Sequence, residues 1–334
     1  MKNVMLLFSL LIVPIWVLGQ VKDMEKGRSY ESGKSITDLD LKKDFDTQIK
    51  ILKKNKKLIV LRGALHFKTI DVGAARIGKG QGATNSVSYA ILEGVSETTK
   101  KEITQAYHDM LVRKLTALGY SFVDQNQLET SNKYEFLSEK AYDNDMGNKT
   151  IGRYQVATAG NYPVFKPAMG NMSVYQASLK MSKQLDVPLL SFDAIIDFAR
   201  FDIDAKRWKT PGYGPGYDFQ TTRSDVNILP QIGIQSYNGM QMNPISSGLS
   251  LTDENGRYDF VHLKKNMYVV ENYATDIDTY QGKMPESMKR IVTINQQTTG
   301  TFVVKADEEK YKRLVLEALD AFSDYLIASI EAKI

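Results

Sequence analysis

Four aspartates within one short stretch are the residues best suited, by type, to acid–base chemistry. They are Asp193, Asp197, Asp202 and Asp204. On an extended strand Asp193 and Asp197 would lie about 13 Å apart, beyond the separation of about 5 to 9.5 Å that glycosidase carboxylates need. Asp202 and Asp204 would lie about 6.6 Å apart, which falls within that range. This pair supports one hypothesis, a glycan-directed hydrolase centred on Asp202 and Asp204.

Residues 201–204 also resemble part of the chitinase strand motif. That motif places its acidic proton donor two positions further on, where this chain has Lys206. The resemblance therefore stops short of the proton donor. A solvated strand end is the alternative interpretation of the two aspartates.

Other motifs for catalysis or metal binding are incomplete. The chain has no cysteine, which excludes thiolate chemistry and disulfides. Its three histidines, His66, His108 and His262, lie far apart and in no metal-binding spacing, so packing or surface roles are expected. In the glycine-rich stretch 78–84, Lys79 comes too early for a phosphate loop, and this stretch is predicted to be a hairpin tip. We expect no metal and no cofactor.

Aromatic residues among glycines and prolines are the stronger functional feature. Rigid rings give much contact area at little entropic cost, so such segments are typical of sugar stacking and protein interfaces. The alternative is that they fold back over the domain. The candidate binding residues, predicted to lie on loops, are Trp208, Tyr213, Tyr217 and Phe219, and separately Tyr162 and Phe165.

Composition and the N-terminal sequence indicate a globular, exported protein. The 334 residues include 43 basic and 39 acidic ones, too small an excess to indicate a nucleic-acid partner. Lys2 followed by the apolar stretch 5–19 is typical of a signal peptide over residues 1–19, because the stretch is too short to span a bilayer and contains Pro14. Without a cysteine the mature chain cannot be lipidated there. A periplasmic or secreted protein is expected.

Hydrophobic periodicity predicts the architecture. After a flexible leader over 20–36, helices are predicted over 37–54, 99–118, 128–141, 173–185 and 308–333, and strands over 58–72, 86–95, 120–124 and 187–203. A hairpin is predicted around Glu254–Gly256, and Asp307 is predicted to cap the last helix. The sequence therefore predicts a single α/β domain over 37–334, with α+β as an alternative. It would have one mixed sheet flanked by helices, a strand-rich C-terminal half and a C-terminal amphipathic helix.

Two features leave alternatives open. The apolar stripe of the helix over 308–333 must be covered, either by the domain's own sheet or by a second copy in an oligomer. Lysines 53, 54, 56 and 57 either form a patch for anionic surface polymers or merely complement the negative end of a helix.

Segments Met110–Asp124 and Val187–Phe198, with a helix between them, resemble the helix–strand–helix–strand core of curli-secretion lipoproteins and related TolB-like envelope proteins. These families are non-enzymatic α/β modules of the cell envelope. This chain lacks their lipidated cysteine, and the resemblance carries over no functional residue.

The leading hypothesis is an exported, non-catalytic protein that binds or assembles with another envelope component. The expected partner is an envelope protein or a polysaccharide, not a nucleic acid, and no membrane span is expected once the signal peptide is removed.

Overall fold

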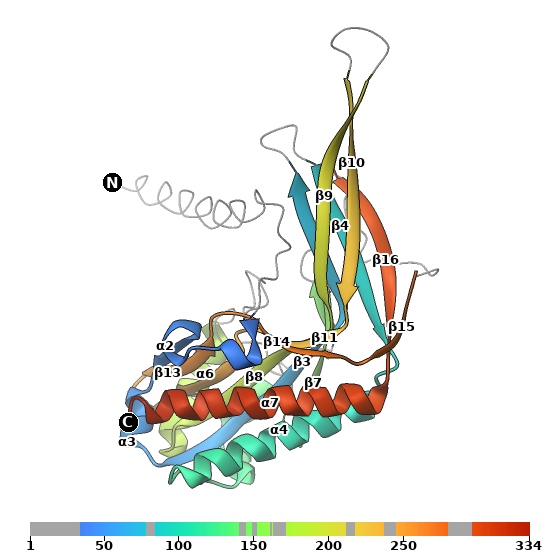
Figure 1. Cartoon of the computed structure of the whole chain (residues 1–334). Coiled ribbons are helices and arrows are strands. Elements are labelled where there is room, and N and C mark those ends of the chain that lie inside the picture. Colours follow the sequence, from blue (N-terminus) through green and yellow to red (C-terminus); the bar gives the residue numbers. More distant parts are fainter. Residues whose placement is uncertain are drawn as a thin grey trace, which may run out of the picture.

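The computed structural model describes residues 34–77, 84–139, 145–148, 152–160, 162, 172–211, 218–236, 245–279 and 296–334, and all structural statements concern these residues. Their strands form one large mixed sheet with helices packed against it, together with a separate two-stranded ribbon (Figure 1). The predicted α/β class is confirmed. No helix in the described ranges is long and apolar enough to cross a membrane.

The strands, in chain order, are β1 (Lys34–Ser35), β2 (Phe45–Gln48), β3 (Lys57–Ile77), β4 (Thr84–Glu93), β5 (Ser121–Phe122), β6 (Asp145–Asn148), β7 (Gly152–Thr158), β8 (Leu189–Asp197), β9 (Arg200–Pro211), β10 (Asp218–Leu229), β11 (Gln231–Gln235), β12 (Gly248–Thr252), β13 (Tyr258–Leu263), β14 (Met267–Asn272), β15 (Ala274–Thr279) and β16 (Gln296–Ala306). The helices are η1 (Ile36–Asp38), α2 (Leu41–Asp44), α3 (Lys50–Lys54), α4 (Glu97–Ala117), η3 (Gln125–Thr130), α5 (Asn132–Glu139), α6 (Met172–Leu185) and α7 (Glu308–Glu331).

Strand β3, 21 residues long, runs through the centre of the sheet. Its first half pairs in parallel with β8, from Ile59 to Phe67. Its second half pairs antiparallel with β4, from Ile70 to Ile77. A parallel pair covered on both faces needs apolar residues on both faces, which explains the continuous apolar run at residues 58–61. The predicted hairpin tip at 78–84 lies almost wholly outside the described residues, and it connects these two antiparallel strands.

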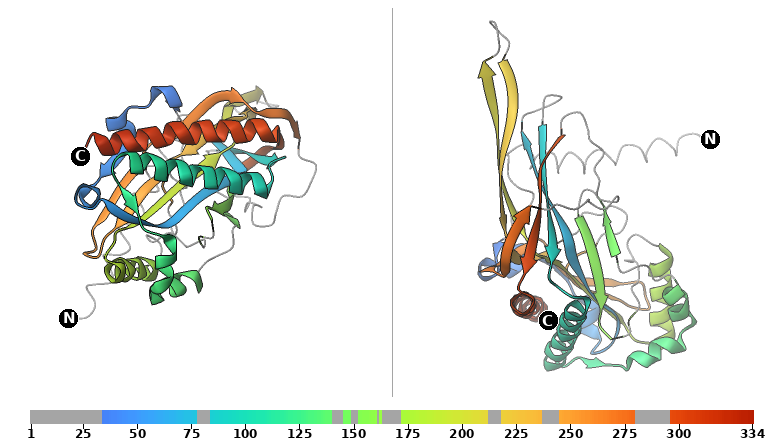
Figure 2. Two further views of the ribbon diagram at one scale, coloured as in Figure 1. Left: turned by 90° about the horizontal axis from the view of Figure 1, so that it is seen from below. Right: turned by 90° about the vertical axis from the view of Figure 1, so that its right-hand side faces the viewer.

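Helices α4 and α7 lie side by side against one face of the sheet (Figure 2). The apolar stripe of α7 is covered by the chain's own sheet and by α4, as one of the two sequence-based alternatives required. The buried apolar residues of α7 are Tyr311, Leu314, Val315, Ala318, Leu319, Phe322, Leu326 and Ile330.

The N-termini of α4 and α7 are joined by hydrogen bonds. Asp307 caps α7 as predicted, because its side chain accepts from the Lys310 backbone N–H at 3.1 Å. The Glu308 carboxylate accepts from the Thr99 hydroxyl at 2.6 Å and from the Ser96 N–H at 2.7 Å. Ser96 caps α4 and accepts from the Thr99 N–H at 3.1 Å, so the helix begins two residues before the predicted start at 99.

The predicted helix over 37–54 is wrong. This stretch is divided into η1, α2, β2 and α3, because β2 pairs with β13 across the sheet edge. The buried Asp259 carboxylate accepts from the backbone N–H groups of Ile51 and Leu52, which fixes the start of α3. Order also begins earlier than predicted, since β1 pairs with β14 from Lys34 onward.

Strands β9 and β10 form a long hairpin, called the ribbon below. They pair along twelve residues each, from Arg200 opposite Leu229 to Pro211 opposite Asp218. The ribbon rises from the body beside β3, β4 and β16 and extends past their described ends (Figures 1 and 2). It is the most prominent projection of the described structure.

Candidate functional site

Both described ends of the aromatic segment predicted as a loop are strand. Trp208 lies on β9 opposite Thr221, and Phe219 lies on β10 opposite Thr210. The loop prediction extended too far because glycine and proline crowd only residues 211–216, whereas Trp208 and Phe219 lie outside that run and pair across the two strands. Tyr213 and Tyr217 lie outside the described residues. Trp208 and Phe219 therefore occupy the end of the ribbon that is furthest from the body.

The second predicted aromatic site is not an exposed one. Tyr162 is only 6% exposed, and its ring lies 6.0 Å from the ring of His108 on α4. Burial raises the pKa of the Tyr162 hydroxyl. The ring packs on the body, which is the folded-back alternative, and cannot meet a partner there. Phe165 lies outside the described residues.

The two candidate catalytic aspartates lie on β9, near the base of the ribbon. Asp202 pairs with Asn227 and Asp204 pairs with Asp225. Residues two apart on a strand, and their direct cross-strand partners, occupy positions on the same face. Asp225 therefore adds a third acidic position beside the predicted pair, and the hydrolase hypothesis stays a prediction.

The base of the ribbon is anchored on the sheet by apolar packing. Phe201 on β9 is 1% exposed, and Ile228, its partner on β10, is also buried. A Cβ added to Gly73 of β3 would lie 2.4 Å from the Phe201 ring. Glycine at position 73 is therefore what allows the ribbon to sit this close to β3.

Where the ribbon meets the body, three segments of the chain each change the strand with which they pair. Strand β3 passes from β8 to β4, while β8 ends at Asp197 and the chain continues into β9. Residues 267–279 pass from β11 to β16, with Tyr273 at the change. Backbone groups lose their ladder partners at such a place, and buried backbone groups need others.

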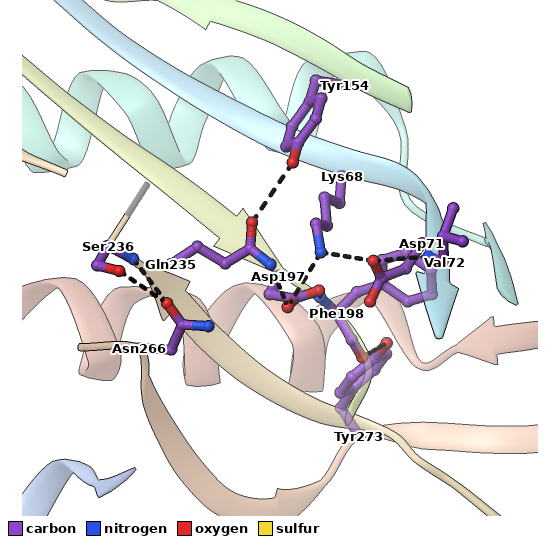
Figure 3. A network of polar contacts seen from close by, with 10 residues as sticks. All are labelled: Lys68, Asp71, Val72, Tyr154, Asp197, Phe198, Gln235, Ser236, Asn266 and Tyr273. Carbon is purple, nitrogen blue, oxygen red and sulfur yellow. Dashed lines mark hydrogen bonds and ion pairs between the residues drawn. The ribbon is translucent and has the colours of Figure 1, made fainter. Parts of the chain in front are cut away.

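A buried polar network supplies these partners (Figure 3). The Asp197 carboxylate accepts from the Phe198 N–H at 2.9 Å, and the Tyr273 hydroxyl donates to the Phe198 carbonyl at 2.6 Å. The Asp71 carboxylate accepts from the Val72 N–H at 2.8 Å. The side chains thus supply hydrogen bonds to backbone groups on two of these segments, at Val72 and Phe198, and the third segment contributes the Tyr273 hydroxyl.

One buried cation joins the two carboxylates of this network. Lys68 is 2% exposed, and its Nζ lies 2.5 Å from Asp71 and 3.3 Å from Asp197. Gln235 of β11 donates to Asp197 at 3.0 Å and lies 3.4 Å from the Tyr154 hydroxyl, which donates to it. Ions this deep are tolerated only when paired and hydrogen-bonded.

A second buried network also lies between β3 and β8. It is centred on Asp193, four residues before Asp197 on β8. The Asp193 carboxylate is paired with the Arg62 guanidinium and lies 3.0 Å from His66 Nε2. Burial alone would raise the Asp193 pKa, but Arg62 and His66 outweigh it, so the pKa is lowered. Because the ionised carboxylate can only accept, His66 donates through Nε2.

Both networks are inaccessible to a substrate. Asp193 and Asp197 are 6% and 0% exposed, so their role is to join strands and orient the ribbon's base. The described residues contain no group of three or more His, Asp or Glu able to hold a metal ion. Chemistry at a surface therefore has to come from the ribbon or another exposed feature.

From the sequence, only the separation between Asp193 and Asp197 was considered, and the ion-pair partner of each was not predicted. A signal was available, since Arg62, His66 and Lys68 lie an even number of residues apart, and so on one face, in a largely apolar segment, and two aspartates lie four residues apart in another. Opposite charges on two buried strands must pair. The charges therefore predict that the two strands are adjacent. They do not predict which cation pairs with which carboxylate.

Comparison with known proteins adds no relative: no family model, no curated protein and no solved structure matches the chain.

Proposed function

We propose that this is an exported, non-catalytic protein that binds another component of the cell envelope, and that the ribbon makes the contact. The observation that carries the proposal is the projection of the ribbon past the described ends of its neighbouring strands (Figure 1). Twelve residues of extended chain span about 40 Å. Phe201 and Ile228 anchor the base of this length.

A projecting two-stranded hairpin has little folding stability of its own. Such hairpins are at best marginally stable in water, and need a third strand or another surface for independent stability. The ribbon pairs with no third strand in the described part of the chain. Both outer edges therefore offer backbone N–H and C=O groups for strand addition, a common mode of protein recognition.

The aromatic residues suit the same role. Trp208 and Phe219 lie among the last four residue pairs toward the ribbon's tip. Aromatic side chains are enriched at the centres of protein interfaces because they are large and rigid. The exported, non-enzymatic character follows the signal-like N-terminus and the resemblance to envelope proteins, which support the proposal independently of the ribbon.

The experiment shortens the ribbon in register. Because Asp204 pairs with Asp225, residues 205–224 can be replaced by an Asn-Gly turn that closes a two-residue hairpin. The shortened protein keeps Phe201 and Ile228, so we expect a nearly unchanged melting temperature. We expect it to lose co-sedimentation with isolated cell-envelope fragments, which the full chain should show.

Phe201→Ala serves as the control for the anchor. Truncating this buried ring should lower the free energy of unfolding by about 3 to 5 kcal/mol, so stability loss and binding loss become separable. Undiminished binding by the shortened protein would overturn the ribbon as the contact element. The hydrolase alternative is tested on a polysaccharide panel: reducing ends released by the full chain but not by Asp202→Asn would overturn the non-catalytic assignment.

A further inference from the structure

Five lysines lie within eight residues on α3 and the start of β3. They are Lys50, Lys53, Lys54, Lys56 and Lys57, here called the lysine patch, and all five are exposed. The segment between Gln48 and Leu58 contains no acidic residue. Figure 1 places α3 at the end of the body opposite the ribbon's tip, near the C-terminus.

The positive charge of the lysine patch is not balanced by nearby carboxylates in the described residues. Elsewhere on the body, some partly buried lysines meet carboxylates: Lys312 lies 2.6 Å from Glu102 and Lys114 lies 2.7 Å from Asp320. In the described part of the chain no carboxylate lies within ion-pair distance of any lysine of the patch. Without these five, the 43 basic residues of the chain would fall below its 39 acidic ones.

Among the described residues, local side-chain contacts engage the charge of one of the five. Lys56 Nζ lies 4.0 Å from the centre of the Tyr120 ring and donates to the Leu118 carbonyl at 3.4 Å, at the C-terminal end of α4. Complementing a helix end thus accounts for Lys56. It leaves Lys50, Lys53, Lys54 and Lys57 with their charges directed to solvent.

The residues that surround the lysines indicate which class of anion the patch can bind. The patch contains no arginine, whose fork suits bidentate phosphate recognition in nucleic acids. Its apolar members, Ile51 and Leu52, are buried, as is Tyr120, so the patch offers no ring for base stacking and no apolar anchor for a bilayer. What remains is a row of mobile point charges, which fits a flexible polyanion.

We propose that the lysine patch binds an anionic polysaccharide. The patch lies away from the ribbon, so the chain could hold a surface polymer at one end and a partner at the other. This inference does not depend on the ribbon's role, and either can fail without the other.

The test measures binding of the full chain to dextran sulfate, with neutral dextran of the same length as the comparison. We expect binding to dextran sulfate alone, and weakening of that binding as salt screens the charges. Replacing Lys50, Lys53 and Lys54 by glutamine should weaken binding at least about tenfold, because each lysine near an anionic surface contributes on the order of 1 kcal/mol. The salt dependence should become shallower.

The matched control removes the same charge elsewhere, with glutamine at the exposed Lys101, Lys180 and Lys183. An equal loss in this control would show that net charge, not the patch, binds the polymer, and would overturn the proposal. So would stronger binding to duplex DNA, or to vesicles containing phosphatidylglycerol, than to dextran sulfate. Circular dichroism and melting temperature establish that both triple variants are folded.

Discussion

At the scale of single residues, the partly buried His262 is expected to couple the stability of this protein to pH. It lies on β13 between Gly248 of β12 and Asp46 of β2. A Cβ at Gly248 would approach the ring to 2.9 Å, so the site is closely packed. Burial lowers the His262 pKa to about 4, against weaker raising effects of Asp193 and Asp46.

The consequence for stability has a definite sign. Between pH of about 6.5 and about 4, the unfolded chain binds a proton on this histidine that the folded chain does not, so stability falls as pH decreases through that window. The contribution is at most about 3 kcal/mol. His262→Gln should reduce the loss of melting temperature between neutral pH and about pH 4. Identical pH profiles for His262→Gln and the parent chain would contradict the assignment.

At the scale of elements, the apolar stripe of α7 packs in the core of the chain. Phe322 is fully buried, and its ring is stacked 6.2 Å from that of Phe45 on β2. Phe322→Ala should therefore lower the free energy of unfolding by about 3 to 5 kcal/mol. The exposed Lys333→Ala should change it by less than about 0.5 kcal/mol. Denaturant unfolding measures both, and sedimentation velocity should give the same oligomeric state for all three proteins. A variant that kept its stability but lost an oligomer would show that α7 assembles copies instead.

At the scale of the whole molecule, the N-terminal sequence predicts the cellular compartment of the protein. The apolar stretch 5–19 is shorter than the ~20 residues that span a bilayer, and Pro14 interrupts it. We therefore predict that the exported protein begins at or near Gln20. Intact-mass measurement of the protein recovered from the exported fraction checks this. A mass that still includes residues 1–19 would contradict cleavage.

The sequence by itself determined the elements whose signals are local. The apolar run of β3, the stripe of α7 with its Asp307 cap, and the turn at Gly256, where φ is +74°, each depend on residues a few positions apart. Periodicity and turn chemistry act over such distances, so these predictions were confirmed.

Only the tertiary structure decided the partners of the buried charges and the form of the aromatic segment. Arg62 meets Asp193 across 131 residues, and Lys68 meets Asp197 across 129. Strand β2 forms inside a helical pattern because β13, more than 200 residues later, offers its edge. Helical spacing stabilises a short segment only weakly, whereas a strand ladder and a buried carboxylate at Asp259 stabilise the alternative. Which strands meet depends on how the whole chain closes its sheet, and no local pattern contains that information.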